Sequence, residues 1–275
     1  MRAQLISLGL VAAAAAGGSL YWFDQVGEHR QLMIDALKAD DARRVTKLFH
    51  TPYIDIDDTN LPLIGAVNTY VGYAVMYDAR RSFPLLLNEG ADVELTARGW
   101  PPLLAVVSWY SSSPTTALYW TDKLIAAGAD PKRIATTYGY PSNIMLQASF
   151  RCGGPRAPVG WDLVIRDLRR RGISNDGDVA QLKRTPLHAA VQAIKGWQGG
   201  RNEGASACLD SIRALLDPSL PGGRPRVDVL DSYGKRAIDY TCGPGDEPTR
   251  YPGLTAVKRE AKTLLLQAGS PPQPC

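Results

Sequence analysis

The motif Leu124-Ile125-Ala126-Ala127-Gly128-Ala129-Asp130 repeats a motif that lies 38 residues before it, Leu86-Leu87-Asn88-Glu89-Gly90-Ala91-Asp92. Two weaker copies follow, at Leu168-Arg169-Arg170-Arg171-Gly172-Ile173 and at Leu265-Leu266-Gln267-Ala268-Gly269-Ser270. Each copy is typical of a helix that ends at glycine, because glycine adopts positive φ without a Cβ clash. The chain is therefore predicted to consist of several copies of one helical unit.

A second motif predicts where each unit begins. Proline suits the first turn of a helix, where its missing N–H would have no partner anyway. The predicted starts of short apolar helices are Pro62–Val67, Pro102–Val107, Ser142–Leu146 and Pro186–Val191. Extended or turn-like segments between the units are Val93–Gly99, Lys132–Gly139 and Val227–Gly234. The predicted unit is thus a pair of helices with a protruding hairpin.

This unit resembles the ankyrin repeat. The closest matches are the hexad Thr185-Pro186-Leu187-His188-Ala189-Ala190 and the Gly-Ala-Asp triplets at 90–92 and 128–130. The resemblance extends from about residue 28 to residue 270 and implies an all-α, ankyrin-like helical-hairpin solenoid of about five to six degenerate repeats. It also implies a structural role for His188, in hydrogen bonds with Thr185 and with the backbone of the adjoining hairpin. We expect one ankyrin-repeat domain over 24–270 and a C-terminal tail over 271–275.

The predicted units are longer than those of the family. Ankyrin repeats recur about every 33 residues, whereas the unit starts at positions 62, 102, 142, 186 and 237 are 40, 40, 44 and 51 residues apart. We expect long insertions between the two helices of a unit, at Tyr110–Thr121, Cys152–Gly160 and Gly196–Ala205, and one on the hairpin side at Asp217–Pro225. Capping helices are predicted at Gln31–Lys38 and Ala42–Phe49, and a closing helix at Ala256–Ala268.

The amino terminus is apolar. Arg2 precedes a run without charged residues, Ala3–Phe23. About 20 apolar residues behind a cation are typical of an export signal or a membrane anchor, which leaves the rest of the chain outside the cytoplasm. We expect residues 1–23 to stay in the inner membrane as an anchor, because an aromatic collar suits a membrane interface. A cleaved signal peptide and a buried amino-terminal helix are the alternatives. The predicted location is the periplasm.

The rest of the composition is that of a globular protein. The chain has 275 residues, of which 45% are hydrophobic and 21% are charged, and this excludes disorder, collagen and a polytopic membrane protein. Residues 24–150 carry 11 basic and 14 acidic side chains (11 − 14 = −3), and residues 151–275 carry 19 and 13 (19 − 13 = +6). A mildly acidic half is therefore joined to a basic half.

The four cysteines predict disulfide bonds. None is spaced as Cys-x-x-Cys, which disfavours zinc and thioredoxin-type sites. In an oxidising compartment an even number predicts two disulfides, for which three pairings are possible. The favoured pairing is Cys152 with Cys208 and Cys242 with Cys275, and free buried thiols are the alternative.

No catalytic motif is evident in the sequence. The three histidines have no serine, cysteine or metal ligand at motif spacing: His29, His50 and His188. The acidic cluster at Asp55, Asp57 and Asp58 lacks the other positions of a calcium loop and is interpreted as a hairpin tip. The run Arg169-Arg170-Arg171 is interpreted as a basic helix end. We therefore predict a chain that is not an enzyme and that uses no cofactor, metal, nucleic acid or small-molecule substrate.

Aromatic residues give the clearest indication of a binding surface. Counted from the predicted unit starts, Tyr70, Tyr110 and Phe150 are equivalent and are predicted to form a column, either by packing between repeats or as contacts to a partner. The insertion that holds Trp109, Tyr119 and Trp120 is predicted to be exposed. Together with Trp161 and Trp197, these eight residues are the predicted partner-binding set.

These features predict a protein-binding module. The resemblance to exported ankyrin-like proteins suggests an immunity protein that binds and neutralises a secreted antibacterial toxin, such as a lipase or a cell-wall hydrolase. A scaffold or stabilising partner of an endogenous periplasmic enzyme, such as one of the oxidative-stress response, is the alternative, and an enzyme built on the solenoid is a third interpretation. The membrane is expected to be contacted only through the N-terminal segment.

Overall fold

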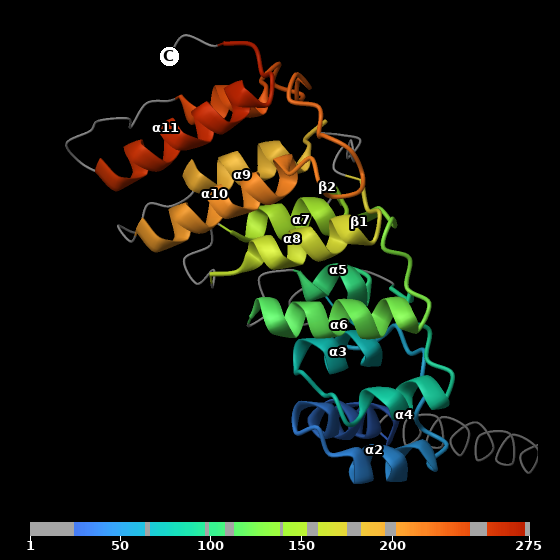
Figure 1. Cartoon of the computed structure of the whole chain (residues 1–275). Helices are drawn as coiled ribbons and strands as arrows, with labels where there is room; N and C mark the ends of the chain where they lie inside the picture. The colour runs from blue at the N-terminus through green and yellow to red at the C-terminus, as the bar shows by residue number, and fades with distance from the viewer. Residues whose placement is uncertain are drawn as a thin grey trace, which may run out of the picture.

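The computed structural model is an elongated column of helices (Figure 1). It describes residues 25–63, 67–96, 99–107, 113–137, 140–152, 159–174, 183–195, 202–242 and 252–272. The first helix is described over residues 25–38. The elements that follow are α2 (Ala42–Phe49), α3 (Tyr70–Met76), α4 (Phe83–Asn88), α5 (Pro102–Val106), α6 (Pro114–Ala126), β1 (Ala135–Thr137), β2 (Tyr140–Ser142), α7 (Ile144–Arg151), α8 (Trp161–Arg170), α9 (Pro186–Lys195), α10 (Asn202–Leu216), the 3₁₀ helix η1 (Ala237–Thr241) and α11 (Pro252–Gln267).

Within the described residues, the helices are arranged in pairs that stack in chain order. The first helices of successive pairs pack on one another, α3 on α5, α5 on α7, α7 on α9 and α9 on η1. The second helices form the other layer, in which α6 packs on α8, α8 on α10 and α10 on α11. The predicted all-α solenoid of helical hairpins is confirmed, except that a 3₁₀ helix takes the place of the first α-helix in the last unit.

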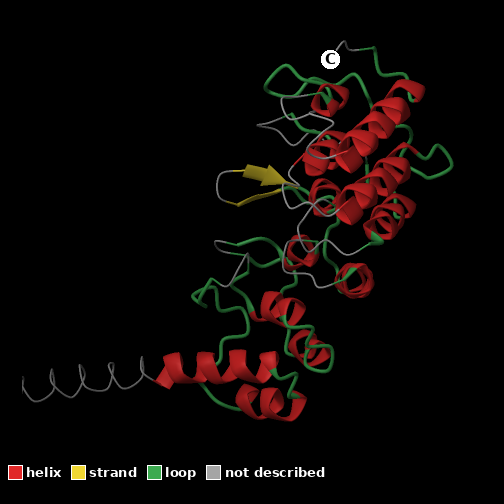
Figure 2. Ribbon diagram, turned by 90° about the vertical axis from the view of Figure 1, so that its left-hand side faces the viewer, coloured by secondary structure: helices red, strands yellow, loops and turns green. Residues whose placement is uncertain are grey.

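Each pair is joined to the next by a segment that we call a finger. The five fingers cover residues 50–69, 89–101, 127–143, 171–185 and 217–236. In the third finger, β1 and β2 pair antiparallel with Ala135 opposite Ser142, and this hairpin projects to one side of the column (Figure 2). The start of the first helix lies against the first finger, where the ring centroids of His29 and Tyr53 are 4.6 Å apart.

The glycine motifs end second helices as predicted. Gly90, Gly128, Gly172 and Gly269 all have positive φ, between 76° and 102°. In each case the next residue donates its N–H to a carbonyl five positions earlier, for example Ala129 to Leu124 at 2.9 Å. This is the hydrogen bond of the Schellman motif, and it satisfies a carbonyl that the helix end leaves without a partner.

The predicted start of the first full unit is wrong. The helix begins at Tyr70 and not at Pro62, because the hydroxyl of Thr69 accepts the Gly72 N–H at 3.1 Å and caps the helix. The corresponding N-cap of the next unit, Pro101 before α5, follows 32 positions after Thr69, close to the family period. Tyr70 therefore lies in the first turn of α3, whereas Phe150 lies near the end of α7. Tyr70 and Phe150 are therefore not at equivalent positions, and Tyr110 lies outside the described residues.

The insertions are shorter than predicted. Pro114 starts α6, and the Ser113 hydroxyl caps this helix by accepting the Thr116 N–H at 3.1 Å. Most of the predicted insertion Tyr110–Thr121 is therefore helix, and so is the end of Gly196–Ala205, since α10 begins at Asn202. The predicted insertion Cys152–Gly160 does lie between the two helices of one unit, α7 and α8. The hairpin-side insertion Asp217–Pro225 follows α10, as predicted.

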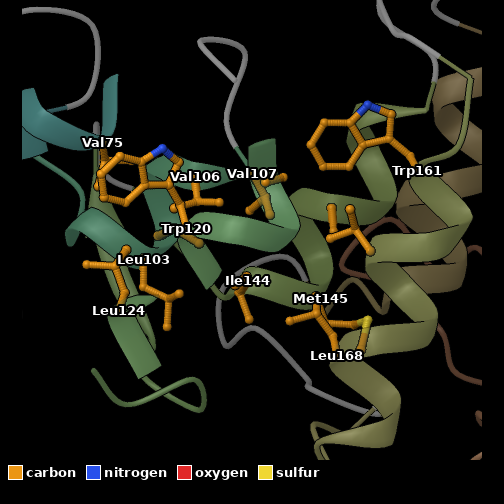
Figure 3. Packing of buried hydrophobic residues seen from close by; sticks show 14 of the residues in the cluster. Val75, Leu103, Val106, Val107, Trp120, Leu124, Ile144, Met145, Trp161 and Leu168 are labelled. Carbon is orange, nitrogen blue, oxygen red and sulfur yellow. The ribbon is translucent and has the colours of Figure 1, made fainter. Parts of the chain in front are cut away.

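One hydrophobic cluster runs through the column from Met33 to Leu265. Trp120 and Trp161 are its largest members, and Figure 3 shows them among the apolar side chains of neighbouring units. A disulfide joins Cys152, at the end of α7, to Cys208 in α10, with 4.9 Å between the Cα atoms. Both cysteines are fully buried, and this predicted pairing is confirmed. Cys242 is also disulfide-bonded, but its predicted partner Cys275 lies outside the described residues.

The two ends of the chain lie outside the residues that the structure describes. The predicted anchor over residues 1–23 and the end of the tail, 273–275, are outside the described residues. Within the described part of the chain, no helix is both long enough and apolar enough to cross a membrane.

Candidate binding surface

His188 holds two units together. Its Nδ1 lies 2.8 Å from the Thr185 hydroxyl, and its Nε2 lies 3.0 Å from the carbonyl oxygen of Lys235 in the fifth finger. A carbonyl only accepts, so Nε2 carries the proton and Nδ1 is free to accept. Burial lowers the pKa of His188, which keeps the imidazole neutral. The predicted structural role is confirmed.

Arg169 caps a helix of the next unit. Its guanidinium is fully buried and donates to five backbone carbonyls. The acceptors and their distances are Ala214 at 2.8 Å, Leu215 at 3.1 Å, Asp217 at 2.7 Å, Leu220 at 3.0 Å and Gly223 at 2.9 Å. The predicted capping role is correct, but the capped end is that of α10 and the start of the fifth finger, not the end of its own helix. A planar fork of donors suits such a set of carbonyls.

The acidic residues of the fingers bind the backbone of the chain itself. Asp57 accepts the Asp92 N–H and Glu94 accepts the Asp130 N–H, both at 2.9 Å, so each of the first two fingers is bonded to the next. Asp58 pairs with Arg30 of the first helix. Within the described ranges, no three His, Cys, Asp or Glu side chains form a group that could hold a metal ion.

Two further aspartates link units at the opposite end of the helices. Asp40 has a φ of 46° and accepts the backbone N–H groups of Arg81 and Ser82, at 3.0 and 2.9 Å. Asp78, with a φ of 56°, accepts the indole N–H of Trp120 at 2.8 Å. These two residues were not predicted from the sequence, because a non-glycine residue with positive φ has no distinct sequence signal.

Among the described members of the predicted aromatic binding set, none is exposed. Tyr70, Trp120 and Trp161 are at most 1% exposed, so their side chains offer nothing to a partner. We correct their assignment to core packing. Tyr119 and Phe150 are half-buried: the Arg80 guanidinium lies 4.2 Å from the Tyr119 ring centroid, and Phe150 packs on Leu146 and Ala189. The other three predicted residues lie outside the described residues: Trp109, Tyr110 and Trp197.

Solved structures share this arrangement of helices. An ankyrin repeat domain from Acinetobacter baumannii (ABAYE2397) matches 87% of this chain and 98% of its own, with 20% identity and a TM-score of 0.51. The ankyrin repeat domain of Bcl-3 matches 87% and 86%, with 18% identity and a TM-score of 0.56. The chain has the ankyrin-repeat fold. A chain from the complex of the Bdellovibrio bacteriovorus endopeptidase Bd0816 with immunity protein Bd3460 matches at 15% identity, over 86% and 97%, but its TM-score of 0.49 adds nothing to this assignment. No protein-family model and no curated protein matches the sequence.

Of the seven large apolar residues that are exposed in the described part of the chain, four lie on the ankyrin fingers, and the other three are Val159, Leu163 and Leu266. Leu63, Ile134, Leu230 and Tyr233, which lie on three different fingers, are 43–66% exposed. None of these four was predicted from the sequence as a contact residue, because the exposure of each depends on how its finger turns. The finger side is therefore the candidate binding surface.

Proposed function

We propose that this chain is a protein-binding scaffold that acts without catalysis. The observation that carries this proposal is that the residues best suited to chemistry already hold the repeats together. His188 bonds Thr185 and the Lys235 carbonyl, Arg169 bonds five carbonyls, and Asp57 bonds the next finger. A column of repeats held in this way presents a large, rigid surface, which suits the binding of another protein.

The proposed location is the periplasm, with the chain exported or held in the inner membrane by residues 1–23. The buried disulfide between Cys152 and Cys208 supports this location, since such bonds persist in oxidising compartments. In that location, we propose that the chain is an immunity protein, which binds and neutralises a secreted antibacterial toxin.

The test uses the product of the neighbouring reading frame as the candidate toxin. Titration calorimetry of the purified full-length chain with this protein is expected to give a 1:1 complex. Deletion of the gene is expected to make cells sensitive to neighbours that deliver the toxin. Absence of binding, together with unchanged resistance, would rule out the immunity role. Lower activity of an endogenous periplasmic enzyme under oxidative stress in the deletion strain would then favour the stabilising role.

A further inference from the structure

The tip of the fifth finger is built as a fixed turn. Asp231 is buried, with 4% of the residue exposed, and its carboxylate accepts the N–H groups of Tyr233 and Lys235, at 2.9 and 3.0 Å. The Tyr240 hydroxyl donates to the other carboxylate oxygen at 2.5 Å. Burial alone would raise the pKa of Asp231, but these hydrogen bonds outweigh it and hold the pKa below its ordinary value. The turn therefore stays ordered around a charged carboxylate.

This turn presents two apolar side chains to solvent. Leu230 is 52% and Tyr233 66% exposed, and only three positions separate them. Side chains on an ordered turn lose little conformational freedom on binding, so they contribute more to affinity than the same side chains on a mobile loop. Aromatic anchors of this kind are typical of binding hot spots.

Basic side chains accompany these two apolar side chains. The Arg184 guanidinium, from the fourth finger, lies 5.7 Å from the Tyr233 ring centroid. Lys183 and Lys235 are exposed, and neither ammonium group forms an ion pair with any residue that the structure describes. Asp231, which lies 4.0 Å from the Arg184 guanidinium, is buried, and the exposed Asp228 of the same finger pairs with Arg226. The surface of the tip is thus apolar at its centre and positive around it.

The first two fingers have the opposite charge. In the sequence they carry six acidic residues, Asp55, Asp57, Asp58, Glu89, Asp92 and Glu94, and one basic residue, Arg98. A partner that lies along the fingers therefore meets acidic groups at the amino end and basic groups at the carboxyl end. Complementary charge of this kind selects the partner and sets its orientation.

We propose that the tip of the fifth finger binds a protein surface that has an apolar pocket with carboxylates around it. Leu230 and Tyr233 enter the pocket, and Lys183, Arg184 and Lys235 face the carboxylates. This inference rests on the proposed function, because it assigns a contact site for the same protein partner.

The experiment measures the binding of the neighbouring-frame protein to variants of the full-length chain. Leu230→Ala/Tyr233→Ala is expected to raise the dissociation constant at least 30-fold, mainly through faster dissociation. Lys183→Glu/Lys235→Glu is expected to slow association about tenfold at low salt and to reduce its salt dependence. The control is Arg43→Glu/Lys47→Glu, an equal charge change on exposed residues of α2, which is expected to stay within twofold of the unchanged chain. Thermal unfolding of each variant verifies that it folds.

The outcomes separate this inference from the proposed function. If the unchanged chain does not bind the neighbouring-frame protein, the proposed function fails. If it binds and both finger variants bind within twofold of it, only the fifth-finger site is wrong.

A membrane is the other occupant to test. A bimane label is attached at Tyr233→Cys, and its quenching by brominated lipid is measured in phosphatidylglycerol nanodiscs. Quenching of this label, together with unchanged binding of the neighbouring-frame protein by the finger variants, would assign the tip to lipid and overturn the proposal. The matched position for this label is Val159→Cys, which is 73% exposed and lies between α7 and α8.

Discussion

Replacement of Arg169 tests how the repeats are held together. Arg169 is fully buried, and two of its five acceptor carbonyls belong to the buried residues Ala214 and Leu215. A hydrogen bond from a charged donor contributes about 1.5–3 kcal/mol, so loss of these two bonds costs about 3–6 kcal/mol. Removal of a buried charge recovers part of its desolvation cost. We therefore expect Arg169→Met to lower the free energy of unfolding by about 2–4 kcal/mol.

The lysine variant separates geometry from charge. Arg169→Lys keeps a cation in the same place but loses the planar fork, and a buried ammonium is harder to desolvate. We expect it to be at least as unstable as Arg169→Met. The assay is urea unfolding followed by circular dichroism, with tryptophan fluorescence as a second probe because Trp161 begins the same helix. Arg170→Met is the control, since Arg170 is exposed on that helix and its loss is expected to cost under about 0.5 kcal/mol. Equal stability of the Arg169→Met and Arg170→Met variants would refute the capping role.

Three further predictions concern the frame of the solenoid. Cys152→Ala/Cys208→Ala removes the bond between two cysteines 56 residues apart and is expected to lower the free energy of unfolding, measured in denaturant, by about 4 kcal/mol. A decrease of less than about 1 kcal/mol would contradict a stabilising bond. Gly128→Ala places a Cβ at a φ of 102° with no atom within 4 Å and is expected to cost about 1 kcal/mol, from backbone strain and not from a clash; an unchanged melting temperature would argue against a fixed helix end. The buried His188 has a pKa below the ordinary value of about 6.5, so its contribution to stability is present above that pH and is lost as pH falls below it. The free energy of unfolding measured from pH 7.5 to 5 is expected to show this loss in the unchanged chain but not in His188→Asn. Equal slopes of the free energy of unfolding against pH in the two proteins would contradict this prediction.

Local sequence signals predicted the ends of the helices well. Glycine after an apolar pair specifies the Schellman bond at Gly128 by itself, because the only requirement is a residue that accepts positive φ. The hexad Thr185–Ala190 was equally informative, since its resemblance to the ankyrin repeat predicted the hydrogen bond from His188 to the backbone of the next finger. These features depend on a few neighbouring residues, or on a family pattern, and not on the full three-dimensional arrangement.

The binding surface could not be predicted in the same way. Trp120 and Trp161 look like contact residues in the sequence, but only the stacking of units shows that they fill the core. The start of the first unit was misplaced because Pro62 resembles a helix start, whereas the hydroxyl of Thr69 forms the actual cap. Tyr233 is exposed because Asp231 fixes its turn, and this bond network is visible only in three dimensions.

The most direct test of the central claim is the stoichiometry of inhibition. Fixed amounts of the purified neighbouring-frame toxin are titrated with the full-length chain while toxin activity is measured. A scaffold that acts by binding is expected to reduce the activity linearly, to zero at one chain per toxin. Undiminished activity at excess chain would show that this protein is not the partner, and complete loss at far less than one chain per toxin would show catalysis and contradict the account.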